Sequence, residues 1–290
     1  ISWSTPQVLA QTRAVLEAVK YPHKLLPPVV DIDTAADWLA IHAQPDGIGA
    51  ATRALLTQEL PAPPGQKPVI SVIVPVRNES AQLAELLPHL KAIGAGEVLV
   101  VDGESTDATA AHCVASGLRV EHSQAGRARQ MNAGALVAKG DVLLFLHADT
   151  RLPPGWRAAV EHAVRQNPAG RFDVAVIGET RRYTILSACI NPHSLLKGIA
   201  TGDQALFITR RKVQEIGGFP DQPLMEDIEL CKRLKRNGGS RLAVLPLTVT
   251  TSGRRWDQRG FWPTVFLMWE LRLRYWLGDS PEVLAQRYRQ

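Results

Sequence analysis

A short apolar run that ends directly in polar side chains is the feature that most constrains this chain. Val142 to Leu146 form an uninterrupted apolar run, which is bounded by charged and turn-forming residues and is too short for an isolated helix. Such a run predicts a buried strand of a parallel sheet. His147 and Asp149 follow two positions apart, so both side chains leave the strand on one face if the backbone stays extended.

Ligands of an open α/β sheet bind beyond the carboxyl ends of its strands, where these two side chains are expected. An imidazole and a carboxylate can hold a divalent cation there, and the cation can hold a diphosphate. A second interpretation stays open, in which Asp149 caps the helix expected from about Pro153 and His147 is a hydrogen-bonded loop residue.

The pattern of strand, turn and helix repeats from residue 69 onward. Strands are expected at 70–74, 97–101, 118–121, 142–146, 172–178 and 204–208. Helices are expected at about 83–94, 105–117, 126–140 and 224–238. Strands that alternate with helices of this length predict an α/β fold with a doubly wound, mainly parallel sheet.

The chain divides by composition into four segments. Residues 1–60 have a helical pattern of their own, and 61–68, P-A-P-P-G-Q-K-P, predict an interdomain linker. Residues 69–250 carry the α/β pattern, and 251–290 form a basic and aromatic loop followed by an amphipathic C-terminal helix. Ile rather than Met at position 1 favours a chain that begins inside a longer product.

The composition is that of an ordinary packed protein, since 45% of the 290 residues are hydrophobic. The net charge of +5 favours anionic ligands without distinguishing among them. Three cysteines without C-x-x-C spacing indicate neither a disulfide framework nor a zinc site, and favour a reducing compartment. Because neither a secretory signal nor a membrane-spanning run is recognisable, a cytoplasmic protein is expected.

Polar residues recur at the predicted carboxyl ends of the strands. Asn78 and Glu79 follow the first strand, Asp102 ends the second, and Asp149 follows the fourth. Taken singly, each suits a structural role in a loop. Taken together, they favour a ligand of the nucleotide type.

Four sequence blocks carry a family resemblance: S-V-I-V-P-V-R-N-E at 71–79, V-V-D-G-E-S-T-D at 100–107, G-R-A-R-Q-M-N-A-G at 126–134 and F-L-H-A-D-T at 145–150. In this order they resemble a family 2 glycosyltransferase of the GT-A fold, most nearly a bacterial subgroup often encoded near radical-enzyme and selenium-related genes. The resemblance covers about residues 68–260. Segments 4–12 and 25–37 resemble the end of a nucleotidyltransferase-like transferase domain, so residues 1–60 are expected to be the C-terminal remnant of a fused domain.

The resemblance implies a nucleotide pocket formed by Pro75, Arg77, Glu79, Asp102, Arg127, Arg129 and Asn132. Asp102 would accept a hydrogen bond from a ring N–H of the base, which is expected to be uracil. Arg127 and Arg129 would carry the diphosphate, and Asn132 would contact the ribose or a phosphate. Many relatives have a second acid after the base-binding one, whereas Gly103 stands here, and this departure weakens the assignment of the base. A solvated helix start is the alternative for the arginines.

The metal motif also departs from the family pattern. Most relatives have Asp-x-Asp where this chain has His147-Ala148-Asp149. Asp149 matches the acid that reaches the metal and is the expected principal ligand. For His147 three roles stay open: second ligand, donor to the phosphate, or structural residue. Oxygen ligands suit both Mg²⁺ and Mn²⁺, and the imidazole tilts the choice toward Mn²⁺.

A Glu-Asp pair at a helix start supplies the general base in the related enzymes, which implies Asp227 here, with Glu226 as its substitute. The structural alternative is that both acids suit the dipole of a helix first turn. By the same resemblance, the acceptor and diphosphate side is expected to hold Asp203, Arg254, Arg255 and Trp256. A surface anchor is the alternative for the basic and aromatic members of that group.

The tail at 261–290 is expected to be helical, with one face formed by Trp262, Phe266, Trp269, Leu273 and Trp276. Two interpretations of this face stay open. It packs on the catalytic domain or on a second copy in a homodimer, or it makes peripheral contact with the inner face of the plasma membrane as an interfacial helix.

These features predict a glycosyltransferase that moves a sugar from a nucleoside diphosphate donor, expected to be a UDP-sugar, to an acceptor hydroxyl or carboxylate. Inversion and a cofactor, Mn²⁺ or Mg²⁺, are expected. The resemblance implies a lipid-like acceptor, and nucleic acid is not an expected partner. The alternatives are a non-catalytic nucleotide-sugar-binding module and a nucleotidyltransferase, although residues 75–80 lack the glycine-rich, lysine-containing loop that the latter needs.

Overall fold

The computed structural model describes residues 67–178, 182–237 and 241–289. The chain separates into two compact units, Ile1–Pro61 and Ala62–Gln290, and the described residues all belong to the second. The domain remnant expected at 1–60 and most of the linker expected at 61–68 lie outside the described residues and stay predictions.

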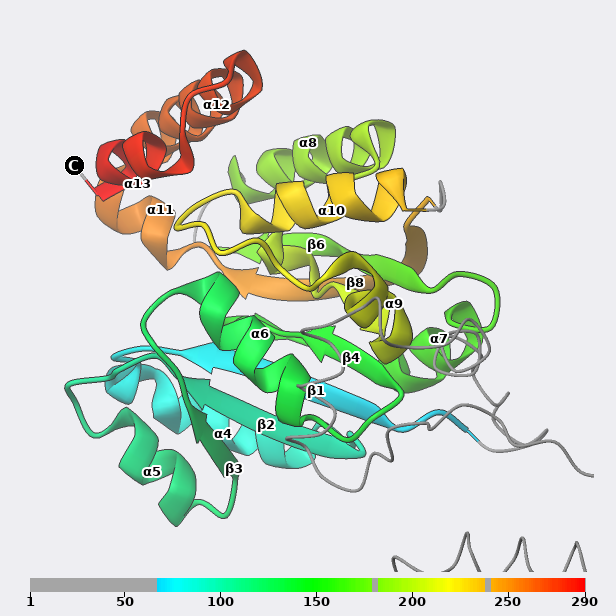
Figure 1. The fold of residues 1–290 in the computed structure, drawn as a ribbon. Helices are drawn as coiled ribbons and strands as arrows, with labels where there is room; N and C mark the ends of the chain where they lie inside the picture. The colour runs from blue at the N-terminus through cyan, green and yellow to red at the C-terminus, as the bar shows by residue number, and fades with distance from the viewer. Residues whose placement is uncertain (1–66, 179–181, 238–240, 290) are drawn as a thin grey trace, which may run out of the picture. The chain divides into compact units, whose positions relative to one another are not determined.

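An eight-stranded sheet forms the centre of the described residues (Figure 1). Its strands are β1 (Ile70–Val76), β2 (Glu97–Asp102), β3 (Arg119–His122), β4 (Val142–Phe145), β5 (Thr150–Arg151), β6 (Ala169–Ile177), β7 (Phe207–Thr209) and β8 (Ala243–Ser252). Their order across the sheet is β3-β2-β1-β4-β7-β6-β8-β5.

The half of the sheet from β3 to β4 is entirely parallel. In this half β1, β4 and the second part of β2 are buried on both faces and are largely apolar, as their sequences predict, whereas β3 at the edge of the sheet is only half-buried. The register places Val76 beside Asp102, and Asp102 beside His122. The carboxyl ends of these strands are therefore level with one another, at the edge where the polar residues of the sequence blocks lie.

The other half of the sheet is mixed. β7 lies antiparallel between β4 and β6, β8 runs parallel to β6, and β5 pairs antiparallel with β8. The strand expected at 204–208 begins only at Phe207, because Gly202–Gln204 form a 3-10 turn, η3. β8 was not expected. Pro246 interrupts its apolar pattern, and the pairing skips past it through a register shift opposite Phe172/Asp173.

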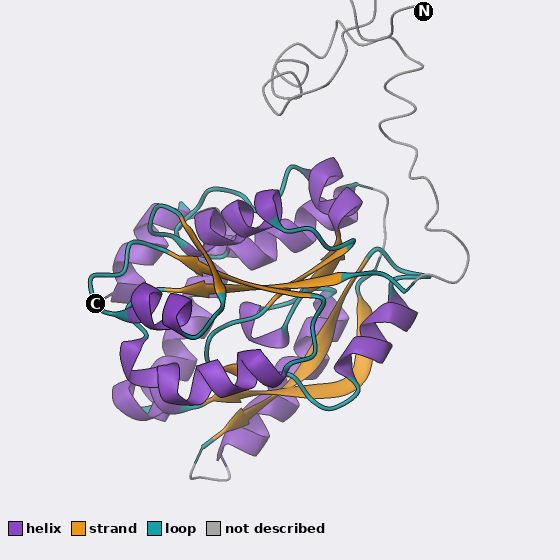
Figure 2. Ribbon diagram, turned by 90° about the horizontal axis from the view of Figure 1, so that it is seen from below, coloured by secondary structure: helices purple, strands orange, loops and turns teal. Residues whose placement is uncertain are grey.

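Helices cover both faces of the sheet (Figure 2). One core cluster holds residues of α4 (Leu83–Ala92), α5 (Thr109–Ala115) and α7 (Trp156–Ala163), and the other holds residues of α6 (Arg127–Val137), α9 (Arg210–Ile216) and α10 (Glu226–Arg236). Successive residues of one strand point to opposite faces, so Val72 and Val74 belong to the first cluster and Ile73 to the second. The predicted doubly wound α/β fold is confirmed.

The described residues form four further α-helices: α8 (Arg182–Lys197), α11 (Arg254–Arg259), α12 (Phe261–Leu277) and α13 (Pro281–Arg289). The stretch expected to be a basic and aromatic loop is the end of β8 followed by α11. The expected helical tail is two helices, which part at Gly278, where φ is 102°. Within the described ranges, no helix combines the length and the apolar character needed to cross a membrane.

Candidate active site

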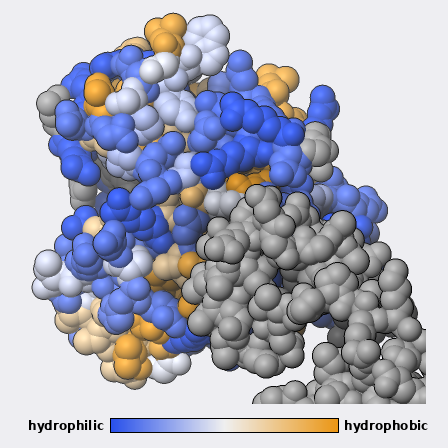
Figure 3. All heavy atoms as spheres, viewed as in Figure 1, coloured by the Kyte–Doolittle hydropathy of each residue, from blue (hydrophilic) through white to orange (hydrophobic). Residues whose placement is uncertain are grey.

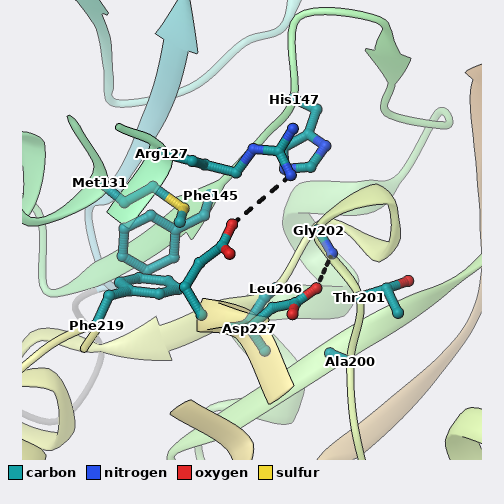
Figure 4. Close-up of a pocket in the computed structure, with 11 residues that line it drawn as sticks. Arg127, Met131, Phe145, His147, Ala200, Thr201, Gly202, Leu206, Phe219 and Asp227 are labelled. Atoms are coloured by element: carbon teal, nitrogen blue, oxygen red, sulfur yellow. Dashed lines mark hydrogen bonds and ion pairs between the residues drawn. The ribbon is translucent and has the colours of Figure 1, made fainter. Parts of the chain in front are cut away.

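A small pocket lies where the end of β4, the segment before β7 and the start of α10 meet (Figure 4). Its lining combines segments far apart in the sequence: Arg127, Met131, Phe145, His147, Ala200, Thr201, Gly202, Leu206, Phe219, Glu226 and Asp227. Met131, Phe145 and Phe219 gather on one side, and the two phenyl rings meet edge to face with 4.8 Å between centroids. The pocket therefore has an apolar wall opposite a group of charged side chains.

His147, Asp149 and Asp203 form a cluster beside this pocket. One ligand atom from each residue lies within 4.8 Å of those of the other two. His147 and Asp149 follow β4, whereas Asp203 comes from η3. The sequence placed Asp203 on the acceptor and diphosphate side, but the structure brings its Oδ1 to 3.1 Å from Nδ1 of His147. The sequence analysis did not predict that Asp203 clusters with the two predicted ligands.

The donor set of this cluster fits Mn²⁺ or Mg²⁺. Two carboxylates supply hard oxygen donors, and the imidazole adds one nitrogen, which Mn²⁺ accepts more readily. Hydroxyl groups of Thr150 and Thr251 lie 3.4 Å from Oδ1 of Asp149 and orient this carboxylate. Thr251 belongs to β8, the strand that the sequence pattern did not reveal. The Nε2 atom of His147 is buried and lacks a hydrogen-bond partner among the described residues.

The interpretation of Asp149 as a helix cap does not hold. The helix that follows, α7, begins at Trp156, and its N-cap position is Gly155. Gly155 has a φ of 78°, and no side-chain cap hydrogen bond is present at this helix start. Asp149 is therefore not needed to start a helix, and its carboxylate is turned toward the cluster.

Gly202 joins the cluster to the predicted base. Its backbone N–H donates a hydrogen bond to Oδ2 of Asp227, with 2.9 Å between the atoms. Its Cα lies against the imidazole of His147, so closely that an added Cβ would be 2.1 Å from Cε1 of the ring. One glycine thus sets the position of both side chains, and only a glycine leaves room for the ring.

Asp227 lies at the start of α10, directly after Met225 and Glu226. Met225 adopts a left-handed conformation with a φ of 64°, which turns the chain into the helix. The Asp227 carboxylate accepts hydrogen bonds from the backbone N–H groups of Gly202 and Ile228, at 2.9 and 2.7 Å. Removal from water and the neighbouring Glu226 carboxylate raise the pKa of Asp227 to about 6. A carboxylate with such a pKa is suited to accept a proton near neutral pH.

Arg127 faces the same carboxylates from the start of α6. Its Nη1 lies 3.6 Å from Oε1 of the buried Glu226 (Figure 4). Desolvation lowers the pKa of the guanidinium, but the carboxylates of Glu226, Asp203 and Asp227 raise it above its usual value. A permanent positive charge therefore lies between the cation cluster and the Glu-Asp pair. That position suits the predicted role of Arg127 toward a diphosphate.

Asp102 carries a second buried polar atom that, like Nε2 of His147, lacks a hydrogen-bond partner among the described residues. Its side chain is 3% exposed at the end of β2. Oδ2 accepts a hydrogen bond from the backbone N–H of Ser105 at 3.1 Å, and His122 Nδ1 lies 3.6 Å away. Oδ1 is buried and has no hydrogen-bond partner in the part of the chain that the structure describes. Buried carboxylate oxygens are seldom left unsatisfied, so this atom indicates a ligand N–H or a water.

Hydrogen bonds connect the loop after β1 to the loop after β2. Asn78 has a φ of 54° and donates its backbone N–H to Ser105 Oγ, while its side-chain oxygen accepts from the backbone N–H of Thr106. The backbone N–H of Glu79 donates to Thr109 Oγ1 at 2.9 Å. These contacts hold the loop that carries Glu79 against the segment that follows Asp102. Of the other predicted pocket residues in this region, Pro75 is half-buried and Arg77 is exposed.

The structure explains the glycine that follows Asp102. A Cβ at Gly103 would lie 2.6 Å from Cδ of Gln130. The Gln130 amide is 4% exposed and donates hydrogen bonds to the carbonyl oxygens of Val76 and Val101, both at 2.8 Å. Gln130 therefore occupies the space that a second acid would need. The sequence offered no signal for this role of Gln130.

Two of the predicted nucleotide contacts have partners within the chain. Arg129 forms an ion pair with Asp221, with 2.8 Å between Nε and Oδ1. The Asn132 amide donates to the carbonyl oxygen of Phe219 and accepts from its N–H, at 2.9 and 2.8 Å. Both side chains attach α6 to the segment before α10. Their contact with a ribose or a phosphate stays a prediction.

The predicted basic and aromatic group lies in α11, outside the lining of the pocket. Arg254 is exposed, and the side chain of Arg255 lies outside the described residues. Trp256 contacts Phe261, with 6.0 Å between ring centroids. α11 begins only three residues after Thr251, whose hydroxyl contacts Asp149 of the cation cluster. The roles of Arg254, Arg255 and Trp256 stay predictions.

Comparisons with known proteins agree on the fold. The similar solved structures include TarS 1-349 of S. aureus in complex with UDP-GlcNAc and the mannosyltransferase PcManGT of Pyrobaculum calidifontis in complex with GDP-Man and Mn²⁺. The TarS structure has a TM-score of 0.52 and 18% identity, over 63% of this chain and 58% of that one. The values for PcManGT are 0.53 and 20%, over 82% and 74%. This chain thus spans less than two thirds of the length of TarS 1-349.

The search of curated proteins found no match. The family model described as glycosyl transferase family 2 matches residues 71–212, which run from β1 into α9 and include Asp102, Arg127, His147, Asp149 and Asp203. The order of strands, the cluster after β4 and the family match lead to one assignment. Residues 71–212 form a glycosyl transferase family 2 domain, and the fold is the GT-A fold of glycosyltransferases.

Proposed function

We propose that the protein transfers a sugar from a nucleoside diphosphate donor to an acceptor hydroxyl with inversion at the anomeric carbon. The observation that carries the proposal is the junction at Gly202. This residue holds Asp227 through its N–H and lies against His147, next to Asp203. A cation cluster for a diphosphate and a carboxylate with a raised pKa therefore share one pocket. That combination suits displacement of a diphosphate by a deprotonated nucleophile.

The donor is proposed to be a UDP-sugar. The unsatisfied Oδ1 of Asp102 suits the imide N–H of uracil, which is a single donor of the kind that this atom requires. TarS binds UDP-GlcNAc and PcManGT binds GDP-Man, so the two similar structures support a nucleotide sugar without selecting the base. Gln130 leaves no room for an acidic side chain at position 103. Asp102 is therefore the carboxylate proposed to face the base.

His147, Asp149 and Asp203 are proposed to hold Mn²⁺ or Mg²⁺. When bound, the cation neutralises charge on the diphosphate as it leaves. Arg127 contributes a second positive charge near the cluster, and the buried Glu226 keeps the guanidinium oriented. Thr150 and Thr251 hold the Asp149 carboxylate, so that the ligand geometry does not depend on the cation alone.

Asp227 is the proposed general base. The acceptor oxygen attacks the anomeric carbon while its proton passes to Asp227. The bond from that carbon to the diphosphate oxygen breaks, and its electron pair stays on the leaving oxygen. The two backbone N–H groups that bind Asp227 keep the carboxylate from rotating away from the acceptor. An acceptor carboxylate would need no base, so the requirement for Asp227 also distinguishes the two acceptor types.

Calorimetry of the full chain with UDP and GDP, each with and without Mn²⁺, tests the donor site. We expect tight binding of UDP only, strengthened at least tenfold by Mn²⁺, and loss of the Mn²⁺ effect in Asp149→Asn. Absence of diphosphate binding under all four conditions contradicts the proposal.

The base is tested by release of UDP from a panel of UDP-sugars with candidate hydroxyl acceptors. Asp227→Asn is expected to bind UDP and Mn²⁺ like the wild type while its kcat falls at least about 100-fold, as for loss of a general base. Unchanged turnover in that variant would assign proton transfer elsewhere. A wild type that binds the donor but never turns it over would support a binding module instead.

A further inference from the structure

One face of α12 exposes an unbroken row of large apolar side chains, which we call the aromatic row. Its members recur every three or four residues: Trp262, Phe266, Trp269, Leu273 and Trp276. All five are between 56% and 80% exposed. This spacing places them on one side of the helix along a length of about 21 Å. Single exposed apolar residues are common, but a contiguous row of this size indicates an interaction surface.

The opposite face of α12 already has its partners. Leu271 is fully buried against Met225 and Leu284. Tyr275 donates a hydrogen bond to Glu229 of α10 at 3.0 Å, and the Lys232 ammonium lies 4.3 Å from the centre of its ring. These contacts determine how α12 sits on the domain. The side chains of the aromatic row are all more than half exposed, so packing on the rest of the domain does not account for them.

The charge around the row is positive. Residues 254–289 contain seven arginines and four acidic residues, a net charge of +3 out of +5 for the whole chain. The acid on α12, Glu270, is already neutralised by Arg274 and Arg287, at 3.5 and 3.2 Å. Arg272 lies one turn from both Trp269 and Trp276 and forms no ion pair with the described residues. An unpaired guanidinium thus flanks the tryptophans.

We propose that the aromatic row docks the protein onto the surface of an anionic lipid bilayer. Tryptophan is enriched at the depth of the headgroups, and arginine binds anionic lipids from the polar side of such a helix. A second copy of the chain fits less well. In such a dimer two positively charged faces would lie against each other. Glu270 would not offset this repulsion, because it already pairs with Arg274 and Arg287 of its own chain.

Neighbouring elements extend the docking face. Phe261 at the start of α12 lies 5.8 Å from Tyr183 of α8, measured between ring centroids. α8 itself exposes Ile185, Leu195 and Leu196. Hydrophobic side chains interrupt the blue surface at the end of the molecule where α12 and α8 lie (Figure 3). The bilayer would therefore lie one helix away from α10, which carries Asp227.

Flotation of the full chain with vesicles tests the docking. We expect binding to phosphatidylcholine vesicles with about 30% phosphatidylglycerol at least tenfold tighter than to pure phosphatidylcholine, weakening in high salt. The tryptophan emission should shift to the blue on binding. The double variant Trp269→Gln and Trp276→Gln is expected to lose at least tenfold in affinity. Leu136→Gln is the matched control, because Leu136 is 78% exposed on α6, and it should bind like the wild type.

Arg272→Glu separates the charge from the apolar contact. It is expected to reduce the preference for anionic vesicles while the tryptophans stay in place. An unchanged melting temperature of each variant shows that the fold is intact, since the substituted side chains lie outside the core. Vesicle binding needs no donor sugar, so its outcome is independent of glycosyl transfer.

Three results would overturn the proposal. The first is vesicle binding by the double tryptophan variant equal to that of the wild type. The second is equal binding of the wild type to neutral and anionic vesicles. The third is a dimer, seen by light scattering, that dissociates in the double variant, because the row would then belong to an interface between two copies.

Discussion

At the scale of the residue, the environment of Asp227 sets the expected pH dependence of the reaction. Its pKa is raised to about 6 from 3.8, because desolvation and Glu226 disfavour the charged form. A general base works only when deprotonated. We therefore expect kcat/KM to rise with pH through about 6 with a slope of one and to level off above it. The measurement is the pH profile of UDP release at saturating Mn²⁺.

A matched variant tests whether Asp227 causes this rise of kcat/KM with pH, which we call the acidic limb of the profile. Glu226→Gln removes the neighbouring negative charge, so the pKa of Asp227 should fall and the limb should move to lower pH. The small residual activity of Asp227→Asn should show no acidic limb in its pH profile. A limb that stays at the same pH in Glu226→Gln would mean that another group controls the profile.

Gly202 makes the second prediction at this scale. In Gly202→Ala the new Cβ would lie 2.1 Å from Cε1 of His147, so the ring must leave its present position. We expect the affinity for Mn²⁺ to fall about 10- to 100-fold, as for changes next to metal ligands. The measurement is Mn²⁺ binding in the presence of UDP, followed by calorimetry.

The control for Gly202→Ala is Gly117→Ala. Gly117 has open space around its Cα and a φ of 78°, so alanine there costs about 1 kcal/mol of stability through backbone strain alone. It should leave the Mn²⁺ affinity unchanged. Equal Mn²⁺ affinities in Gly202→Ala and the wild type would remove His147 from the ligand set.

At the scale of the element, α12 packs against α10, the helix that carries the proposed base Asp227. Leu271 is fully buried against Met225, the residue that turns the chain into α10 ahead of Asp227. We expect Leu271→Ala to lower the free energy of unfolding by about 2–4 kcal/mol, because it leaves a cavity. It should also lower kcat, because the start of α10 is less firmly held. Chemical denaturation and steady-state kinetics measure the two effects.

Leu273 on the same helix supplies the comparison. It belongs to the aromatic row and is 57% exposed, so Leu273→Ala should change the free energy of unfolding by less than about 0.5 kcal/mol. Its kcat without vesicles should equal that of the wild type. If the two alanine variants were equally stable, the inner face of α12 would not be part of the core.

The same scale shows how far the sequence alone reaches. The strands at 70–74, 97–101 and 142–146 were predicted correctly because burial on both faces demands continuous apolar runs. β8 was not predicted, because Pro246 and a register shift break its apolar pattern. The contact between Thr251 of β8 and Asp149 was not predicted for the same reason. Asp203 was predicted as a site residue, but its position next to His147 was not predicted. Their proximity depends on how η3 folds against β4, which no local pattern encodes.

At the scale of the whole molecule, the proposed donor site extends across both halves of the sheet. Asp102 ends β2 in the parallel half, whereas Asp203 precedes β7 in the mixed half. A nucleoside diphosphate bound through its base at one end and a cation at the other would connect the two halves. Each ligand should therefore strengthen the binding of the other, as linkage requires.

This coupling predicts how ligands stabilise the fold. UDP at about 100 times its dissociation constant should add about 2.7 kcal/mol to the free energy of unfolding. UDP and Mn²⁺ together should raise the melting temperature by more than the sum of their separate effects, and EDTA should remove the excess. Asp149→Asn should lose the excess but keep the response to UDP, whereas Asp102→Asn should lose the response to UDP. Strictly additive shifts in the wild type would mean that the base and the cation bind independently, so that one nucleotide does not span the two halves of the sheet.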